Sequence, residues 1–274
     1  MREISVRVRG VEVFVRYEER GQGLPLVLLH GFTGDSRDWA EFAARVPIRS
    51  PWLAIDLLGH GKTDLPEAQE RYHMQEQVAD MEGVFQLIDL RRFFLLGYSL
   101  GGRVALSYAV ARPERVEGLI LESASPGLAA FSEREARRRN DALLAERILK
   151  LGAPAFIEEW EAIPLFASQK SLSLEARNRQ REIRQSQAAI GLANSLYGMG
   201  TGSQPSLWGE LDRLRVPILL ITGELDDKFT RIAAAMQTRF QVAKHVLVNG
   251  AGHNVHLEAP GHYWQAVEGF MKAI

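Results

Sequence analysis

Hydrophobic and polar positions along the chain follow two alternating patterns. Short continuous apolar runs, each of the length of one strand, occur at 24–29, 52–56, 93–97, 118–122, 216–222 and 245–249. Segments of helical length lie between or after them, at 37–46, 73–90, 100–112, 231–240 and 261–273. Strands that are apolar throughout are typical of a parallel sheet with helices on both faces. The alternation therefore predicts an α/β fold with a mostly parallel central sheet flanked by helices.

Two regions depart from this alternation. Residues 4–8 and 11–17 alternate apolar and polar side chains around Gly10, which predicts a β-hairpin. From 127 to 209 the sequence is helical in pattern, with prolines as punctuation and no strand-like run. We therefore expect a core formed by 1–126 and 210–274, with 127–209 inserted as a helical cap over the active site. Ligands bind at the C-terminal edge of such sheets.

Composition narrows the possible functions. The 274 residues include 33 Lys and Arg, 34 Asp and Glu, and no cysteine, for a formal net charge of −1. This balance disfavours a nucleic-acid-binding protein, and the absence of cysteine excludes disulfides, thiolate metal sites and a cysteine nucleophile. No apolar run is long enough to cross a bilayer, and the N-terminal residues do not form a signal peptide. We expect a cytoplasmic monomer that binds neither nucleic acid nor membrane.

One motif carries the chemistry. Gly97-Tyr98-Ser99-Leu100-Gly101 follows the apolar run 93–97 directly and precedes the predicted helix 100–112. This strand–turn–helix context is the one that a nucleophile elbow requires, in which glycines allow a strained turn to expose the serine. The serine hydroxyl would then lie at a helix N-terminus, where the dipole favours an anion. We predict that Ser99 is the reactive serine.

A reactive serine needs a histidine and a carboxylate, which follow it in this order along such chains: serine, acid, histidine. His253 lies in a glycine-rich loop after the last predicted strand, and Asp226 follows the preceding strand. We expect these two to complete a triad with Ser99, while Asp227 and Glu224 are alternatives for the acid. Four other histidines are expected to be structural: His73, His245, His256 and His262.

Backbone amides are expected to form an oxyanion hole. Leu100, directly after the serine, would supply one N–H, and Phe32, in the loop after the first buried strand, would supply the second. His30 is expected to brace that loop. The segment 56–63 is interpreted as a structural turn, because its Gly-Lys-Thr lacks the upstream glycine of a phosphate-binding loop. With no His-Glu-x-x-His and no Gly-x-Gly-x-x-Gly after a strand, we expect no metal and no cofactor.

Together these motifs resemble those of the α/β-hydrolase family, over nearly the whole chain: His-Gly-Phe at 30–32, Asp-Leu-x-Gly-His-Gly at 56–61, Gly-Tyr-Ser-Leu-Gly-Gly-Arg at 97–103, Gly-Glu-x-Asp at 223–226 and Gly-His-Asn at 252–254. Narrower motifs resemble the 2-succinyl-6-hydroxy-2,4-cyclohexadiene-1-carboxylate synthases of menaquinone biosynthesis: Gly-Tyr-Ser-Leu-Gly-Gly-Arg again, Ser-Pro-Gly-Leu at 125–128, an Arg-rich helix, Pro-Leu-Phe-Ala-Ser at 164–168 and Gly-Glu-Leu-Asp-Asp-Lys-Phe at 223–229.

The resemblance implies a cofactor-independent lyase. In that family the triad serine is taken to act as a base that removes a ring proton from a 5-enolpyruvyl precursor, and pyruvate leaves. By the same resemblance, five residues fall on positions that contact the substrate: Tyr98, Arg103, Arg137, Trp160 and Arg184. The substrate carries three carboxylates, so the partner expected here is a small polyanion, which arginine forks bind well.

Some of these assignments have alternatives. Arg138 or Arg139 could replace Arg137 as the contact, and Arg181 could replace Arg184. Arg103 could instead pair with an acid, and Trp160 could be a core residue. The whole chain could also be a carboxylesterase or a carbon–carbon bond hydrolase of the same fold. Separated arginines argue against these hydrolases, because an ester or lipid pocket is apolar. A non-catalytic binder is disfavoured because every triad position is filled.

Overall fold

The computed structural model describes residues 1–274 and is built on one eight-stranded sheet. The strands are β1 (Arg2–Val8), β2 (Val11–Glu18), β3 (Leu26–Leu29), β4 (Trp52–Ile55), β5 (Phe93–Tyr98), β6 (Val116–Glu122), β7 (Ile218–Gly223) and β8 (Ala243–Val248). Their order across the sheet is β1-β2-β4-β3-β5-β6-β7-β8. The β1–β2 hairpin and the β2–β4 pair are antiparallel, and every other pair is parallel. The predicted α/β fold is confirmed.

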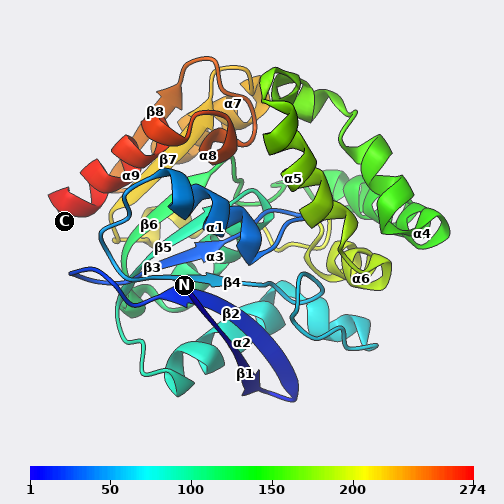
Figure 1. The fold of residues 1–274 in the computed structure, drawn as a ribbon, viewed down its shortest axis with the longest axis horizontal. Helices are drawn as coiled ribbons and strands as arrows, with labels where there is room; N and C mark the ends of the chain where they lie inside the picture. The colour runs from blue at the N-terminus through cyan, green and yellow to red at the C-terminus, as the bar shows by residue number, and fades with distance from the viewer.

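Helices cover both faces of this sheet (Figure 1). They are α1 (Ser36–Arg45), α2 (Met74–Leu87), α3 (Leu100–Ala111), α7 (Asp227–Gln237), the short α8 (Val255–Glu258) and α9 (Pro260–Ala273). Side chains of the buried strands point alternately to the two faces: in β3, Leu26 and Leu28 join the core under α1 and α9, while Val27 and Leu29 join the core under α2, α3 and α7. Burial on both faces explains why these strands are continuously apolar in sequence.

Helix α7 begins earlier than its amphipathic pattern indicates. We predicted a start at residue 231, but the helix starts at Asp227, because the side chain of Asp226 caps it by accepting a hydrogen bond from the amide of Phe229. The prediction was therefore wrong by a full turn. The polar first turn escapes a search for apolar periodicity, since its residues lie at the surface or at the edge of the cavity described below.

All segments between β6 and β7 that have regular structure are helical, with α4 (Phe131–Trp160), the 3-10 helix η3 (Pro164–Ser171), α5 (Leu174–Gln185) and α6 (Ala189–Met199). Figure 1 shows α4, α5 and α6 grouped at one side of the molecule. Helix α4 is interrupted at Gly152, whose φ of 74° breaks the helical path just before Pro154. Helices α4 and α6 share a small core of their own, around Ile148, Phe156 and Leu192.

Polar contacts join α5 and the turn after it to loops of the sheet. The Gln187 amide donates to Asp35 Oδ2 at 2.8 Å and accepts from the backbone amide of Gly61, also at 2.8 Å. In the same region, Gln180 donates to Asp38 at 3.0 Å. These buried hydrogen bonds fix the inserted helices above the loops that follow β3 and β4. None of the helices is long and apolar enough to span a membrane.

Candidate active site

Ser99 lies at the sharp turn between β5 and α3. Its backbone has φ 51° and ψ −107°, a strained conformation for a residue other than glycine, and its amide donates to the backbone oxygen of Glu122 at 2.9 Å. The turn is possible because Gly97 and Gly101 lie against each other: a Cβ on Gly97 would collide with the backbone of Gly101. The predicted strand–turn–helix context is confirmed.

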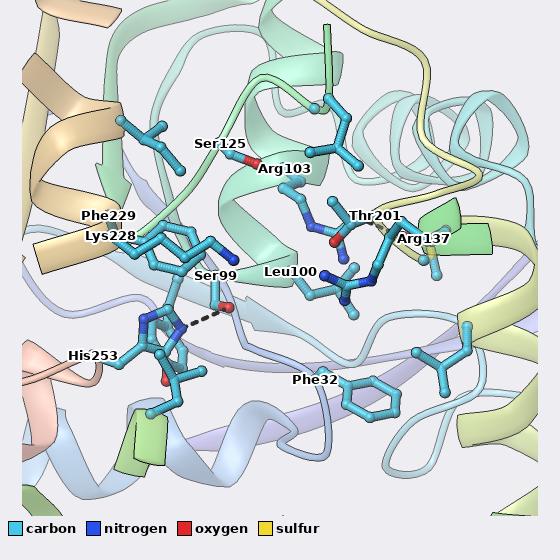
Figure 2. Close-up of a pocket in the computed structure, with 18 of the residues that line it drawn as sticks. Phe32, Ser99, Leu100, Arg103, Ser125, Arg137, Thr201, Lys228, Phe229 and His253 are labelled. Carbon is cyan, nitrogen blue, oxygen red and sulfur yellow. Dashed lines mark hydrogen bonds between the residues drawn. The ribbon is translucent and has the colours of Figure 1, made fainter. Parts of the chain in front are cut away.

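The structure brings Ser99, His253 and Asp226 together. His253 Nε2 lies 3.0 Å from Ser99 Oγ (Figure 2). On its other side, His253 Nδ1 lies 2.6 Å from Asp226 Oδ2. The two alternatives for the acid are elsewhere: Glu224 accepts a hydrogen bond from the amide of Gly250, and Asp227 is exposed. The serine–histidine–carboxylate geometry is therefore the one that base or nucleophilic catalysis by serine requires.

The histidine of this triad is held in place by packing as well as by hydrogen bonds. His253 and Asp226 are buried. The imidazole packs against Phe229 and Tyr98, with ring centroids 4.6 Å and 5.4 Å away, and Phe166 of η3 approaches it edge-on at 6.2 Å. Tyr98 itself is buried, so the ring predicted to contact substrate lies mainly beneath the triad, although it lines the cavity.

The two backbone amides expected to form the oxyanion hole, those of Phe32 and Leu100, are free of protein acceptors. Leu100 is the first residue of α3, so its N–H has no acceptor within the helix, and the amide of Phe32 donates no hydrogen bond. Both residues line the same cavity as Ser99 (Figure 2). Amides in this arrangement can stabilise an oxyanion that develops beside the serine.

The loop that contains Phe32 is braced by histidines. His30 Nε2 accepts from the amide of Leu57 at 3.0 Å, while its Nδ1 lies 2.8 Å from the carbonyl oxygen of Gly31. The bracing role predicted for His30 is confirmed. His60 packs against both His30 and Phe32, and burial lowers its pKa to about 3, so this imidazole is neutral at pH 7.

A cavity of about 410 Å³ opens above the serine, between the sheet loops and the inserted helices. Its wall is largely apolar, with Leu144, Phe166, Leu196, Met199 and Trp208 among its side chains. Cations interrupt this wall at Arg103, Arg137 and Lys228. An apolar cavity with a few fixed charges is suited to a small, charged organic ligand.

Arg103 and Arg137 lie close together and face the cavity (Figure 2). Arg103 has no carboxylate partner: it donates to the backbone oxygen of Met199 at 2.6 Å and to Gln204 at 3.0 Å. Burial, together with the neighbouring charge of Arg137, lowers the pKa of Arg103 to about 10. Arg137 is paired on one side with Asp141 at 2.7 Å. Two neighbouring guanidinium groups that face one cavity can bind an anion.

Lys228 is the cavity cation that sequence reasoning missed. It is the second residue of α7, and Figure 2 shows its amine directed into the cavity on the side of Ser99. It forms no ion pair, and burial and the charge of Arg137 lower its pKa. Its position two residues after Asp226 was the available signal, since the residues that follow a catalytic acid start a helix at the same edge of the sheet.

The two remaining predicted contacts have different surroundings. Trp160, at the end of α4, lines the cavity, and its buried indole Nε1 has no hydrogen-bond partner. It packs against Phe32 and Phe166, so it also serves as core. Arg184 does not line the cavity; it is buried behind Phe166, with Glu161 and Gln169 both 3.3 Å away.

The other arginines considered as alternatives lie outside the cavity. Arg138 pairs with Glu135 at 2.5 Å, and Arg181 pairs with Glu161 at 2.8 Å. Arg139 is exposed. No group of three or more histidine and acidic side chains is arranged to hold a metal ion.

Comparison with known proteins gives this geometry a context. A family model described as the α/β-hydrolase fold matches residues 25–260. The chain belongs to the α/β-hydrolase family. A Bacillus subtilis protein provisionally named 2-succinyl-6-hydroxy-2,4-cyclohexadiene-1-carboxylate synthase is 43% identical over 265 residues, 97% of this chain and 96% of its own. The synthase of that name from Serratia proteamaculans is 33% identical, over 90% of this chain and 92% of its own. The narrower resemblance to a family of synthases is confirmed.

Solved structures agree with this placement. MenH from S. aureus superposes with a TM-score of 0.89 at 33% identity, covering 94% of this chain and 98% of its own. An esterase from Thermogutta terrifontis, solved with malate bound, superposes with a TM-score of 0.85 at 26% identity, covering 100% and 99%. The same fold therefore supports two kinds of chemistry among these relatives, and the residues in the cavity must distinguish them.

Proposed function

We propose that this enzyme is a lyase that eliminates pyruvate from 2-succinyl-5-enolpyruvyl-6-hydroxy-3-cyclohexene-1-carboxylate to give 2-succinyl-6-hydroxy-2,4-cyclohexadiene-1-carboxylate. The observation that carries the proposal is the pair of guanidinium groups, Arg103 and Arg137, in the cavity that the triad shares. Lys228 adds a third cation, and the substrate has three carboxylates. The names of the relatives support the same reaction.

The triad supplies the base. His253, held by Asp226, accepts the hydroxyl proton of Ser99, and the serine oxygen then removes a proton from the ring. This proton lies on the ring carbon that bears the succinyl group, so the electron pair of the carbon–hydrogen bond forms an enolate with the succinyl carbonyl. Negative charge that develops on the carbonyl oxygen is stabilised by the amides of Phe32 and Leu100. The ring carbon–oxygen bond then breaks, and the enolpyruvyl group leaves, takes up a proton and becomes pyruvate.

The cations bind and orient the substrate. Arg103 has no carboxylate of its own, and its two hydrogen bonds use the same terminal nitrogen, so the rest of its guanidinium can form an ion pair with a substrate carboxylate without breaking an existing ion pair. Trp160 supplies an indole N–H with no partner in the free enzyme, which can donate to a substrate oxygen. We place Arg184 behind the cavity wall, where it supports Phe166 in the absence of substrate. The expected partner is thus one small polyanion.

One absorbance experiment tests the proposal. The enolpyruvyl precursor is made enzymatically, purified protein is added, and the formation of the ring diene and of pyruvate is followed together, beside Ser99→Ala and a p-nitrophenyl ester. We expect diene and pyruvate in equal amounts, at a rate that ester hydrolysis does not approach. Rapid ester hydrolysis with no diene above the spontaneous background would instead indicate a hydrolase that uses the same triad.

A further inference from the structure

A second buried histidine–carboxylate pair lies directly beneath the triad. His256, in α8, is three residues after His253, and its Nδ1 lies 2.7 Å from Glu122 Oε2 at the end of β6. Glu122 Oε1 accepts from the backbone amide of His256 at 3.0 Å. Both side chains are fully buried, and neither lines the cavity. Burying a carboxylate in the core costs free energy unless its oxygens are hydrogen-bonded, which suggests that this pair has a role beyond stability.

Glu122 also contacts the serine side of the site. Its backbone oxygen accepts the amide of Ser99 at 2.9 Å, and it pairs with Tyr98 across the β5–β6 register. Glu122 therefore holds the backbone of Ser99 through its carbonyl oxygen and holds α8 through its carboxylate. The His256 ring completes the link, since it packs edge-on against Tyr98 at 5.1 Å and stacks on Trp39 at 4.4 Å.

Helix α8 also hydrogen-bonds directly to the loop that contains His253. Glu258 accepts hydrogen bonds from the amides on both sides of His253, Gly252 at 2.7 Å and Asn254 at 3.3 Å. The triad histidine itself makes only two side-chain hydrogen bonds, to Asp226 and Ser99. Its backbone position therefore depends on α8, whose own anchor in the core is the His256–Glu122 pair.

We propose that His256 and Glu122 are positioning residues that set the distance between the Ser99 hydroxyl and the His253 imidazole. The proposal rests on the triad of the proposed function, although it does not depend on which substrate the triad acts upon. Without the side-chain hydrogen bond of His256, α8 is held to β6 only through its backbone amide, so it can shift and carry the His253 loop with it. A misplacement of about 1 Å is enough to lower the rate about a hundredfold.

Two variants at one position separate this role from packing. His256→Asn places an amide N–H close to the position of Nδ1 and keeps a donor for Glu122, whereas His256→Leu removes that donor. Both lose the ring that stacks on Trp39, and both keep the backbone amide that Glu122 accepts. The difference between the variants therefore isolates the side-chain hydrogen bond.

The readout is the reactivity of Ser99 toward phenylmethylsulfonyl fluoride, measured by mass spectrometry on the folded full-length chain. This reagent needs the triad but not the substrate, so it remains informative if the lyase assay fails. We expect His256→Leu to label about thirtyfold more slowly than the wild type, and His256→Asn to stay within about threefold. In the substrate assay, kcat should fall in the same ratio while KM stays unchanged.

Tyr108→Phe is the matched control, because it removes another buried hydrogen bond to a carboxylate, 2.7 Å long to Glu82, at the far end of α3. It should lower thermal stability and leave the labelling rate unchanged. If His256→Leu does not fold, Glu122→Gln tests the same pair by replacing one carboxylate oxygen with an amide group, with an expected loss of about fivefold in labelling. Equal labelling of the wild type and the variant that is tested, with only the melting temperature lowered, would overturn the proposal.

Discussion

The two halves of the cavity differ in how their polar groups are satisfied. On the side of the sheet, Ser99, His253 and Asp226 are hydrogen-bonded to one another, and Glu258 holds the surrounding amides. On the side of the inserted helices, Arg137 is bonded on one face only, and the Trp160 indole N–H has no partner. The triad of the first half is complete without a ligand, whereas Arg137 and Trp160 in the second half are not.

This difference separates chemistry from recognition. A triad must hold its geometry before the substrate arrives, because reorganisation during the reaction would raise the barrier. A binding group contributes more to affinity when it has no hydrogen-bond partner in the free enzyme, because the ligand then removes the free-energy cost of leaving that group unpaired. Substitutions in the first half should therefore affect kcat, and substitutions in the second should affect KM or substrate preference.

The largest effect is expected at Ser99. Ser99→Ala removes the group that takes the ring proton, and turnover should fall about ten-thousandfold or more, with substrate binding retained. Single-turnover measurement of the diene, with binding followed by calorimetry, checks both parts. More than about a tenth of the wild-type rate would contradict a base role for this serine.

The first half is also the half that could be predicted from sequence. Ser99, Asp226 and His253 each follow a strand in a glycine-rich or polar loop, and the carboxyl ends of parallel strands converge at one edge of the sheet. Strand order is thus enough to bring them together without knowledge of side-chain packing. The start of α7 was missed because its first turn is polar and its cap is the triad acid itself.

The second half depends on helix register, which a single sequence does not fix. Four arginines lie close together at 134, 137, 138 and 139, and only Arg137 lines the cavity. Arg184, predicted from the resemblance, lies behind Phe166, and Lys228 lines the cavity unpredicted. A shift of one residue along a helix turns the side chain by about 100° around the helix axis, which is enough to replace a cavity contact with an exposed side chain.

Arg103 bridges the two halves, because it lies on α3 yet bonds to residues of the inserted region. Arg103→Ala should lower kcat/KM for the polyanionic substrate about a hundredfold and leave a neutral nitrophenyl ester nearly unaffected. Arg103→Lys keeps the charge without the planar fork and should lose about tenfold. Equal losses on both substrates would show that the arginine only supports the fold.

Lys228 gives a smaller effect with a dependence on pH. Lys228→Met should raise KM about tenfold, by removing one cation from the cavity. Burial and Arg137 lower the pKa of this amine, so in the free wild-type enzyme it loses its proton at a lower pH than an ordinary lysine.

As pH rises through that pKa the Lys228 amine loses its charge, and the KM of the wild type rises. Lys228→Arg keeps its charge here, so its KM should stay flat where that of the wild type rises, until Arg103, whose pKa is about 10, begins to lose its own proton. The KM profile on the polyanionic substrate, followed from neutral pH upward toward the ordinary pKa of lysine, measures this difference. A KM that rises in parallel in the wild type, Lys228→Arg and Lys228→Met would assign the titration to another group.

The smallest effect is expected at Trp160, where the comparison can be tested most finely. Trp160→Phe removes one neutral donor and should raise KM about threefold to tenfold. Trp264→Phe is the matched control, because the Trp264 indole N–H is also buried without a partner, but its side chain lies in the core on the inner face of α9, away from the cavity. Both substitutions replace an indole with a smaller phenyl ring, so both should lower thermal stability, while only Trp160→Phe should change KM. A KM unchanged by both would make the Trp160 ring simple packing and leave recognition to the cations.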